Sequence, residues 1–360
     1  MAFVHVTEPG FESGGAELRT RQLFGALHKQ WDEASLSLVP GVRRPPWALP
    51  RLGASMRGIP PRLTQLYDPA VVRSVNALAD GSDLTVASAS FTAALLTRAH
   101  LKHVVLDAHN LEWRVNSQLA ATADGIIRRV AYQATTRWMS HFETSLARSV
   151  AGVWAVSAEE ATWFERLGIC VWVVPNGVDV PSDAQPLPDS HEMLFVGSLN
   201  SVFNRHGLEW FFSHVWPALR RNVPDVRMTI VGGGRPLDAP VGIEQLGFVE
   251  DLVPIYEKAR VCIAPLLGGA GTRLKVLEAM ARARPVVATP VGAEGIDVSE
   301  AEGVFIRADP VAFADACAAL LTDYDAASES GAQGRSRATD FSWDRVASVA
   351  AQSLTDLSRT

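Results

Sequence analysis

The stretch VCIAPLLGGAGTRLKVLEAMARARPVVATPVGAEGI, residues 261–296, decides the fold that the sequence predicts. It opens with a mainly apolar run, as in a buried parallel strand, and residues 268–272 form a glycine-rich turn where bare backbone can approach a ligand. Residues 273–283 are rich in helix formers and carry apolar side chains at helical spacing. The run from Pro285 to Ala288 predicts a second strand. This order places the N-terminus of a helix at the carboxyl edge of a parallel sheet.

That helix N-terminus is a candidate site for a phosphate group, because unpaired backbone N–H groups and the helix dipole both favour an anion there. Arg273 and Lys275 supply mobile positive charge in the first turn, where it opposes the dipole, so a bound anion accounts for them better than helix stability does. Glu278 lies further along the helix, where a carboxylate could accept hydrogen bonds from two hydroxyls of a ribose. The alternative is an ordinary turn with solvated charged side chains.

This segment also resembles a known family. GTRLKVLEAMA, followed by PVVAT and GAEGI, is similar to the nucleotide-sugar-binding segment of the family 4 glycosyltransferases, which are retaining enzymes of the GT-B fold. Their signature is two glutamates separated by seven residues, which here corresponds to positions 270 and 278. Glu278 matches the second, which in the family holds the donor ribose, whereas Ala270 replaces the first, as a small residue does in some branches. The donor-binding residues that the resemblance implies in this segment are Gly271, Thr272, Arg273, Lys275 and Glu278.

Composition limits the class of protein. A chain of 360 residues, 48% hydrophobic and 20% charged, is long enough for two globular domains. Its net charge of −6 does not favour a nucleic-acid partner. The three cysteines are far apart, which is neither a metal-ligand spacing nor a disulfide framework and suits a reducing cytoplasm. No signal peptide or membrane-spanning run is seen, so we expect a cytoplasmic protein, with peripheral contact at the inner face of the membrane left open.

The N-terminal segment predicts a second ligand-facing turn. A short strand over residues 3–6 is followed by a glycine loop and a helix, and Gly14-Gly15 at the helix start could admit a phosphate or a sugar. In the family, a glycine pair after the first strand faces the donor phosphates and the acceptor. A plain strand-to-helix connection is the alternative.

Residues 34–67 combine positive charge with irregular structure. They contain five arginines and no acidic residue, and prolines at 45, 46, 50, 60 and 61 break regular structure. Such a loop, with an exposed tryptophan, could dock on anionic lipid headgroups or hold a phosphorylated acceptor. A solvated surface loop is the alternative. The candidate acceptor residues are Arg43, Arg44, Trp47 and Arg51.

Polar residues follow the strand predicted at residues 103–106. In open α/β sheets the carboxyl end of a strand faces the ligand crevice, and here that end carries Asp107 and His109. DAHNLEW resembles the D-x-H-N segment of the family, whose histidine lies beside the transferring sugar. His109 is therefore the predicted catalytic residue, with a structural histidine as the alternative.

The second half of the chain repeats the alternation of strand and helix. PNGVD, residues 175–179, matches the turn between the two domains of the family, and a proline-rich linker follows. Ser198 stands where family members often carry an arginine that grips the diphosphate, and Arg205 could substitute for a missing cation. Phe248 and Val249 resemble the segment whose backbone reads the nucleobase.

The predicted fold is α/β and GT-B, with two doubly wound Rossmann-like domains facing a cleft. The expected ranges are an acceptor-side domain at 1–182, a nucleotide-sugar-binding domain at 190–338, and a helix at 339–360 that crosses back to the first domain. No dinucleotide fingerprint, P-loop, zinc spacing or nucleophile elbow is present in the sequence, so dehydrogenase, kinase, metallohydrolase and serine-hydrolase functions lack support.

The resemblance implies a retaining hexosyltransferase of the kind used in polysaccharide biosynthesis. It would move a sugar from a nucleotide-diphosphate-sugar donor to a saccharide or lipid-linked acceptor, without a metal or other cofactor. The competing hypothesis is a non-catalytic nucleotide-sugar-binding partner or regulator of another transferase, which Ala270 and Ser198 favour. An epimerase on the same fold fits less well, because no pair of acidic catalytic residues stands out.

Overall fold

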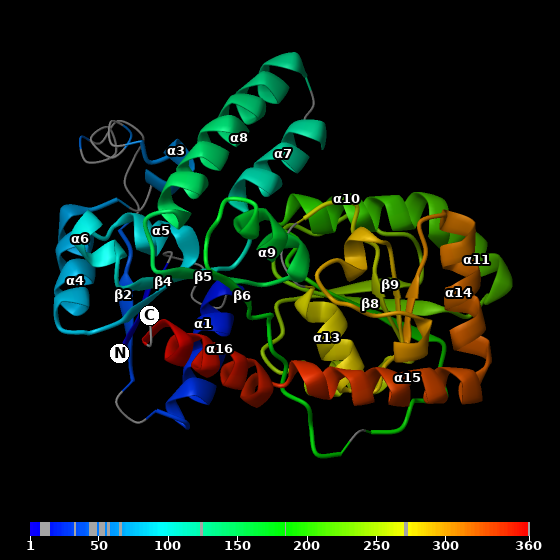
Figure 1. Ribbon diagram of the computed structural model, residues 1–360. Coiled ribbons are helices and arrows are strands. Elements are labelled where there is room, and N and C mark those ends of the chain that lie inside the picture. The colour runs from blue at the N-terminus through cyan, green and yellow to red at the C-terminus, as the bar shows by residue number, and fades with distance from the viewer. Residues whose placement is uncertain are drawn as a thin grey trace. The chain divides into compact units, whose positions relative to one another are not determined.

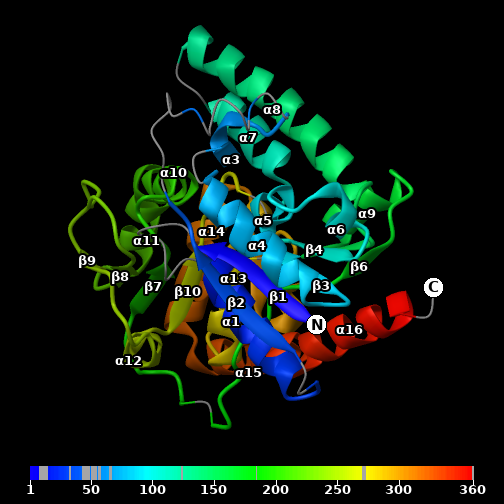
Figure 2. The ribbon, with the colours of Figure 1, turned by 90° about the vertical axis from the view of Figure 1, so that its left-hand side faces the viewer.

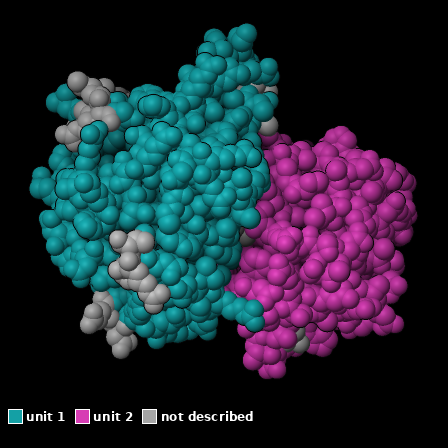
Figure 3. Space-filling view, in the orientation of Figure 1, with its two compact units in different colours: residues 1–176, 343–360 teal, residues 177–342 magenta. Residues whose placement is uncertain are grey.

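The computed structural model describes residues 1–7, 15–31, 34–42, 49, 55, 58–64, 67–122, 125–183, 185–269 and 273–358. The chain forms two compact units: unit 1 consists of residues 1–176 and 343–360, and unit 2 of residues 177–342 (Figures 1 and 3). Residues 177–182, expected in the first domain, and 339–342, expected in the crossover segment, thus belong to unit 2. The reason is that they pair with each other, since the N–H of Val178 donates to the carbonyl of Phe341 at 2.8 Å.

Unit 1 is built on a parallel sheet of six strands in the order β2-β1-β3-β4-β5-β6. The strands are β1 Ala2–Thr7, β2 Ser35–Pro40, β3 Thr85–Ser88, β4 Val104–Ala108, β5 Gly152–Ala155 and β6 Val171–Val173. Every residue of β3, β4 and β5 is buried, as expected for central strands covered on both faces. The carboxyl ends of these strands therefore lie together at one edge of the sheet.

Helices cover this sheet and one pair extends beyond it. The helices of unit 1 are α1 Gly15–His28, α3 Pro61–Thr64, α4 Pro69–Asp80, α5 Ala89–Ala94, α6 Arg98–Leu101, α7 Glu112–Thr122, α8 Ile126–Ala147, α9 Ala158–Glu165 and α16 Trp343–Ser358. α7 and α8 form a helical hairpin that projects from the body of unit 1 (Figures 1 and 2). No helix in the described part of the chain is both long enough and apolar enough to cross a membrane.

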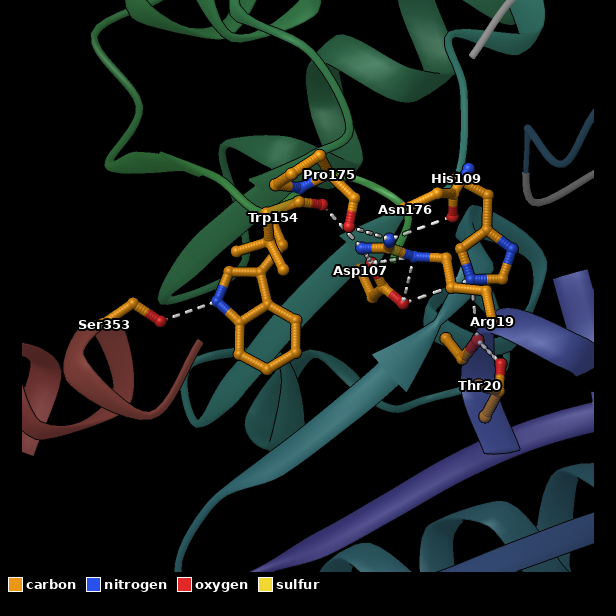
Figure 4. A network of polar contacts seen from close by, with 10 residues as sticks. Arg19, Thr20, Asp107, His109, Trp154, Pro175, Asn176 and Ser353 are labelled. Atoms are coloured by element: carbon orange, nitrogen blue, oxygen red, sulfur yellow. Dashed lines mark hydrogen bonds and ion pairs between the residues drawn. The ribbon is translucent and has the colours of Figure 1, made fainter. Parts of the chain in front are cut away.

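The last helix, α16, belongs to unit 1 although it follows unit 2 in the chain, as the sequence predicts. Its buried face joins a core cluster with α1 and the strands, in which Phe3 and Trp154 are fully buried. The indole N–H of Trp154 donates to Oγ of Ser353 at 2.7 Å (Figure 4), and Lys29, directly after α1, forms an ion pair of 2.9 Å with Asp344.

Unit 2 contains a second parallel sheet of six strands, in the order β12-β11-β10-β7-β8-β9. The strands are β7 Glu192–Val196, β8 Arg227–Val231, β9 Ile243–Gly247, β10 Val261–Ala264, β11 Val286–Ala288 and β12 Val304–Ile306. The helices are α10 Val202–Trp210, η1 Phe211–Val215, α11 Trp216–Asn222, α12 Val253–Lys258, α13 Leu274–Ala281, η2 Val291–Ala293, η3 Glu300–Glu302, α14 Pro310–Thr322, α15 Tyr324–Ala338 and η4 Thr339–Phe341. Strand order reverses between β10 and β7, which is where open α/β sheets bind ligands.

The stretch 261–296 forms β10, α13 and β11, as predicted. α13 is shorter than expected, since it begins at Leu274 rather than residue 273 and ends at Ala281 rather than residue 283. Ala283 adopts a left-handed conformation with φ of 56°, which no helix can continue through.

Candidate functional site

The turns after β7 and β8 pack backbone against backbone at the carboxyl edge of the unit 2 sheet. The N–H of Gly197 donates to the carbonyl of Val231 and the N–H of Leu199 to the carbonyl of Gly233, both at 2.8 Å. Gly232 has φ of +154°, and a Cβ placed on it would lie 2.1 Å from the carbonyl oxygen of Gly197. Glycine is therefore required at 232 for both its conformation and the close approach of the turns.

Lys275, in the first turn of α13, directs its ammonium group at this pair of turns. Its Nζ donates to Oδ1 of Asn204 at 2.9 Å, and a Cβ on Gly197 would lie 2.7 Å from Nζ. The same ammonium lies 4.1 Å from the centroid of the Phe195 ring. Burial and then the charge of Arg273 lower the pKa of Lys275 to about 7. At neutral pH this side chain is close to losing its proton.

Glu278 lies one helical turn beyond Lys275 on α13, half-buried. The hydroxyl of Tyr256, on α12, donates to Oε2 of Glu278 at 3.0 Å. Burial raises the pKa of Glu278, while the Tyr256 hydrogen bond and the charges of Arg282 and Lys275 oppose the rise. Tyr256 was missed by the sequence interpretation, because it is an isolated tyrosine in an apolar run and its partner lies far along the chain.

Arg273 differs from the sequence expectation of mobile positive charge. It is the residue before α13, and its side chain is buried with 7% exposed. Its Nε donates to the carbonyl of Val291 at 2.9 Å, and its Nη2 forms an ion pair of 3.1 Å with Glu294. The guanidinium is thus bound to the loop after β11, where the carboxylate of Glu294 balances its charge.

The other donor-site predictions of unit 2 fall in three places. Arg205, on α10, donates from Nη1 to the carbonyl of Arg235 at 2.7 Å, so it braces the turn after β8. Phe248 follows β9 with 69% of its surface exposed, and Val249 packs partly against the core. Gly271 and Thr272 lie outside the described residues.

A buried arginine joins three elements at the carboxyl edge of the unit 1 sheet (Figure 4). Arg19, on α1, forms an ion pair of 2.6 Å between Nη2 and Oδ1 of Asp107, at the end of β4, and both side chains are almost fully buried. Nη2 also donates to the carbonyl of Val174 at 2.9 Å. Nη1 donates to the carbonyl of Pro175 at 2.8 Å and to Oδ1 of Asn176 at 3.1 Å. The guanidinium thereby ties α1 and β4 to the chain that follows β6.

His109 is attached to this network through one ring nitrogen. Its Nε2 lies 2.9 Å from Oγ of Ser88 and 3.2 Å from Oδ2 of Asp107. Burial alone would raise the pKa of the Asp107 carboxyl. The neighbouring Arg19 and His109 outweigh burial and hold this pKa well below its usual range. A permanent carboxylate favours a proton on Nε2, which leaves the lone pair of a neutral imidazole on Nδ1. That Nδ1 is buried and has no hydrogen-bond partner among the described residues.

A second histidine lies beside the first. The ring centroids of His5 and His109 are 6.2 Å apart. Burial, followed by the charge of His109, lowers the pKa of His5 to about 4. His5 is therefore neutral at pH 7.

Sequence reasoning found His109 but missed Arg19, which lies on the helix after the predicted glycine loop. Its spacing could have indicated this role, because Arg19 lies on the same face of α1 as the buried Leu23 and Leu27. An arginine on a buried face must be paired. Gly15 is the first residue of α1, while Gly14 and the acceptor candidates Arg43, Arg44, Trp47 and Arg51 lie outside the described residues.

Comparison with known proteins shows what part of this chain resembles. The family described as "Glycosyl transferases group 1" matches residues 190–323. The matched segment is therefore similar to group 1 glycosyltransferases. It contains Asn204, Tyr256, Lys275 and Glu278, whereas Arg19 and His109 lie outside it.

Curated relatives match this chain only in part. A protein of Klebsiella pneumoniae described as an "Uncharacterized 44.6 kDa protein in cps region" is 33% identical over 135 residues, which is 34% of this chain and 35% of that protein. The phosphatidyl-myo-inositol mannosyltransferase of Mycolicibacterium smegmatis is 32% identical over 220 residues, or 55% of this chain and 56% of that enzyme. The matches thus span about a third to about a half of these relatives.

Solved structures match the fold of the whole chain. Sucrose-phosphate synthase from Thermosynechococcus elongatus matches with a TM-score of 0.74 at 19% identity, covering 100% of this chain and 99% of that chain. HepE from Anabaena, in complex with UDP and glucose, matches with a TM-score of 0.71 at 16% identity, covering 99% and 100%. At such identities the likeness establishes the fold alone, and the predicted GT-B fold of two Rossmann-like units is confirmed.

Proposed function

We propose that this protein is a retaining glycosyltransferase that moves a hexosyl group from a nucleotide-diphosphate sugar to a saccharide or lipid-linked acceptor. One observation carries the proposal: the Lys275 ammonium faces the glycine turns of unit 2, one helical turn before Glu278, within the segment similar to group 1 glycosyltransferases. A cation, bare backbone turns and a carboxylate in this order match the diphosphate and the ribose of a nucleotide. The complex of the HepE neighbour with UDP and glucose supports the same donor class.

In this proposal Lys275 holds the donor diphosphate together with the N-terminus of α13. The reaction breaks the bond between the anomeric carbon and the diphosphate, so negative charge grows on the leaving diphosphate. An amine that is only partly protonated at pH 7 without ligand becomes fully charged when an anion binds beside it. Glu278, oriented by Tyr256, accepts hydrogen bonds from the ribose hydroxyls.

His109 is the proposed catalytic residue on the acceptor side. Arg19 and Asp107 fix its ring through Nε2, so Nδ1 is available to accept a hydrogen bond from a hydroxyl of the transferring sugar. Arg19 touches the proposed reacting groups only through Asp107 and is a positioning residue. The reaction needs no metal in this proposal, because lysine and helix N–H groups supply the positive field around the diphosphate.

The proposed acceptor carries an anionic group, which Arg43, Arg44 and Arg51 would bind while Trp47 lies against its apolar part. The name of the mannosyltransferase relative, which specifies a phosphatidyl-inositol acceptor, supports this class. A lipid-linked acceptor would place the protein at the cytoplasmic face of the membrane as a peripheral protein. The cationic, proline-broken composition of residues 34–67 suits both roles.

A screen of nucleoside diphosphates and nucleotide sugars by thermal shift tests the donor assignment. A ligand present at 100 times its dissociation constant stabilises the folded protein by about 2.7 kcal/mol, which is readily measured. We expect a nucleoside diphosphate to raise the Tm of the wild type and to raise that of Glu278→Ala by a smaller amount at the same concentration, because the variant binds it more weakly. A wild type that responds to no nucleotide would contradict the proposal.

The second candidate function is a non-catalytic nucleotide-sugar-binding partner of another transferase. Two observations favour it: Ser198 replaces a cation that family members often carry, and the charge of Arg273 is neutralised by Glu294. Both functions predict nucleotide binding, so binding alone cannot separate them. The two functions are distinguished by measuring release of nucleoside diphosphate from a bound nucleotide sugar in the absence of any acceptor. Only the transferase is expected to release it.

A further inference from the structure

The tip of the α7–α8 hairpin exposes large apolar side chains. Ile126, Ile127 and Val130, in the first turns of α8, are 78%, 83% and 57% exposed. Residues 125–131 are exposed on every side of the helix, and the hairpin carries them away from the body of unit 1 (Figures 1 and 2). Apolar side chains grouped at such a tip add nothing to the core, which indicates contact with something outside the chain.

Positive charge predominates in the sequence around this tip. Residues 124–142 contain three arginines, at 128, 129 and 137, and one acidic residue, Asp124. All three arginines are exposed. The chain as a whole has a net charge of −6, so this concentration of arginine is local. Apolar side chains flanked by arginine are the composition of helices that bind anionic membrane surfaces.

The base of the hairpin is anchored, so its tip is presented by a fixed stem. Met139 is fully buried, and the carboxylate of Glu143 accepts hydrogen bonds from the backbone N–H groups of Glu112 and Trp113, both at 3.0 Å. Trp138 donates from Nε1 to the carbonyl of Gly58 at 2.8 Å. Gly58 lies within the arginine-rich segment 34–67, so the described end of that segment is attached to the same helix.

We propose that the hairpin tip is a membrane dock, which inserts Ile126, Ile127 and Val130 among the acyl chains of an anionic bilayer while Arg128 and Arg129 bind the headgroup phosphates. A projecting tip of a few side chains is too small for a stable protein interface, which takes about 800 Å² from each partner. A small group of apolar side chains can insert into a bilayer, and anionic headgroups attract the arginines beside it. This dock lies outside both proposed ligand sites and does not depend on transferase activity.

Vesicle sedimentation tests the dock with four forms of the full chain. The probes are vesicles of phosphatidylcholine alone and of phosphatidylcholine with about one third phosphatidylglycerol, at low and high salt. The forms are the wild type, Ile126→Ser/Ile127→Ser/Val130→Ser, Arg128→Gln/Arg129→Gln, and Val241→Ser as a control. Val241 is 85% exposed in unit 2, so it matches the apolar exposure without belonging to the hairpin.

We expect the wild type and Val241→Ser to bind the anionic vesicles and to bind neutral vesicles at least tenfold more weakly. The triple serine variant should lose at least tenfold in partition coefficient at either salt concentration. The double glutamine variant should lose about 25-fold at low salt, since each basic residue near an anionic surface contributes about fivefold, and much less at high salt. Because the substituted residues are exposed, all forms should share one Tm and one nucleoside-diphosphate affinity, which separates this test from that of the proposed function.

Three outcomes would overturn the dock. The first is vesicle binding by the triple serine variant equal to that of the wild type. The second is loss of binding in a fifth form, Arg43→Ser/Arg44→Ser/Arg51→Ser, and in no other form, which would assign the membrane contact to residues 34–67. The third is a wild type that is oligomeric by light scattering and becomes monomeric in the triple variant, which would identify the tip as an interface between copies of this chain.

Discussion

Lys275 illustrates how a binding residue can weaken the fold that holds it. In an unfolded chain a lysine has a pKa near 10.4, whereas burial lowers the pKa of Lys275 in the folded protein to about 7. Between these values the unfolded state binds more protons, so this residue makes stability increase as pH rises from about 7 toward 10. A residue that reduces stability in this way is typical of a functional site rather than of a structural one.

We predict that Lys275→Met makes the ligand-free protein more stable and abolishes nucleotide binding. Each pKa unit corresponds to about 1.4 kcal/mol, so the gain at pH 7 should be at least about 1 kcal/mol in urea unfolding. Arg205→Met is the matched control, since its side chain lies nearby but is bonded to a backbone carbonyl. A loss of stability in Lys275→Met would show that the lysine is a structural cation.

Nucleotide binding should also take up a proton near pH 8. The anionic diphosphate raises the pKa of Lys275, so the complex holds a proton that the free protein has lost above about pH 7. Affinity for nucleoside diphosphate should accordingly fall as pH rises from 7 to 9, by up to about tenfold per unit. Calorimetry in two buffers of different ionisation enthalpy measures the uptake, and equal apparent enthalpies at pH 8 would contradict it.

Glu278 should contribute to nucleotide affinity through its charge. A hydrogen bond to a charged acceptor contributes about 1.5–3 kcal/mol, so Glu278→Ala should weaken nucleoside-diphosphate binding by about tenfold to a hundredfold. Tyr256→Phe removes only the hydroxyl that orients Glu278, so it should weaken nucleoside-diphosphate binding by only several-fold. Isothermal calorimetry measures both variants, and unchanged affinity in Glu278→Ala would remove this residue from the donor site.

At the scale of elements, the parts that could be predicted are those whose signal is local. The elements β10, α13 and β11 follow from spacing within a few dozen residues, and so does the polar segment after β4 that contains His109. The pairing of Arg19 with Asp107 joins residues 88 apart, and that of Tyr256 with Glu278 joins residues 22 apart. These contacts form only when the strands and helices pack together. The spacing of residues along a single element does not predict that packing.

Arg19 should behave as the residue that ties α1, β4 and the chain after β6 together. Removing one partner of a buried ion pair typically costs 3–5 kcal/mol, so we predict that Arg19→Met destabilises unit 1 by about that amount in urea unfolding. Asp107 contributes its ion-pair stability above the usual aspartate pKa and loses it as pH falls below that range. The difference between wild type and Arg19→Met should therefore shrink in acid, and a difference that is constant from pH 7 to pH 3 would contradict the assignment.

At the scale of the whole molecule, the chain crosses from unit 1 to unit 2 and back, and the two crossings are joined. Val178 near the first crossing pairs with Phe341 and Ser342 near the second, so both ends of unit 2 lie together. A unit with adjacent ends and its own core can fold as an independent domain.

We predict that residues 177–342 alone fold and bind nucleoside diphosphate within about tenfold of the full chain, because Lys275, Asn204 and Glu278 all lie in this unit. The isolated unit should not release nucleoside diphosphate from a nucleotide sugar, since His109 is absent from it. Calorimetry measures the binding, and an assay for nucleoside-diphosphate release measures the hydrolysis. Hydrolysis by the isolated unit at the rate of the full chain would remove His109 from the mechanism.

The central claim is that the full chain performs chemistry on a nucleotide sugar. The most direct measurement is release of nucleoside diphosphate from the best-binding nucleotide sugar without acceptor, in wild type and His109→Ala. We expect slow release by the wild type and at least a hundredfold less by His109→Ala, with nucleoside-diphosphate affinity changed less than threefold between them. Tight binding of the nucleotide sugar with no release by the wild type would contradict the claim and identify the protein as a binding partner.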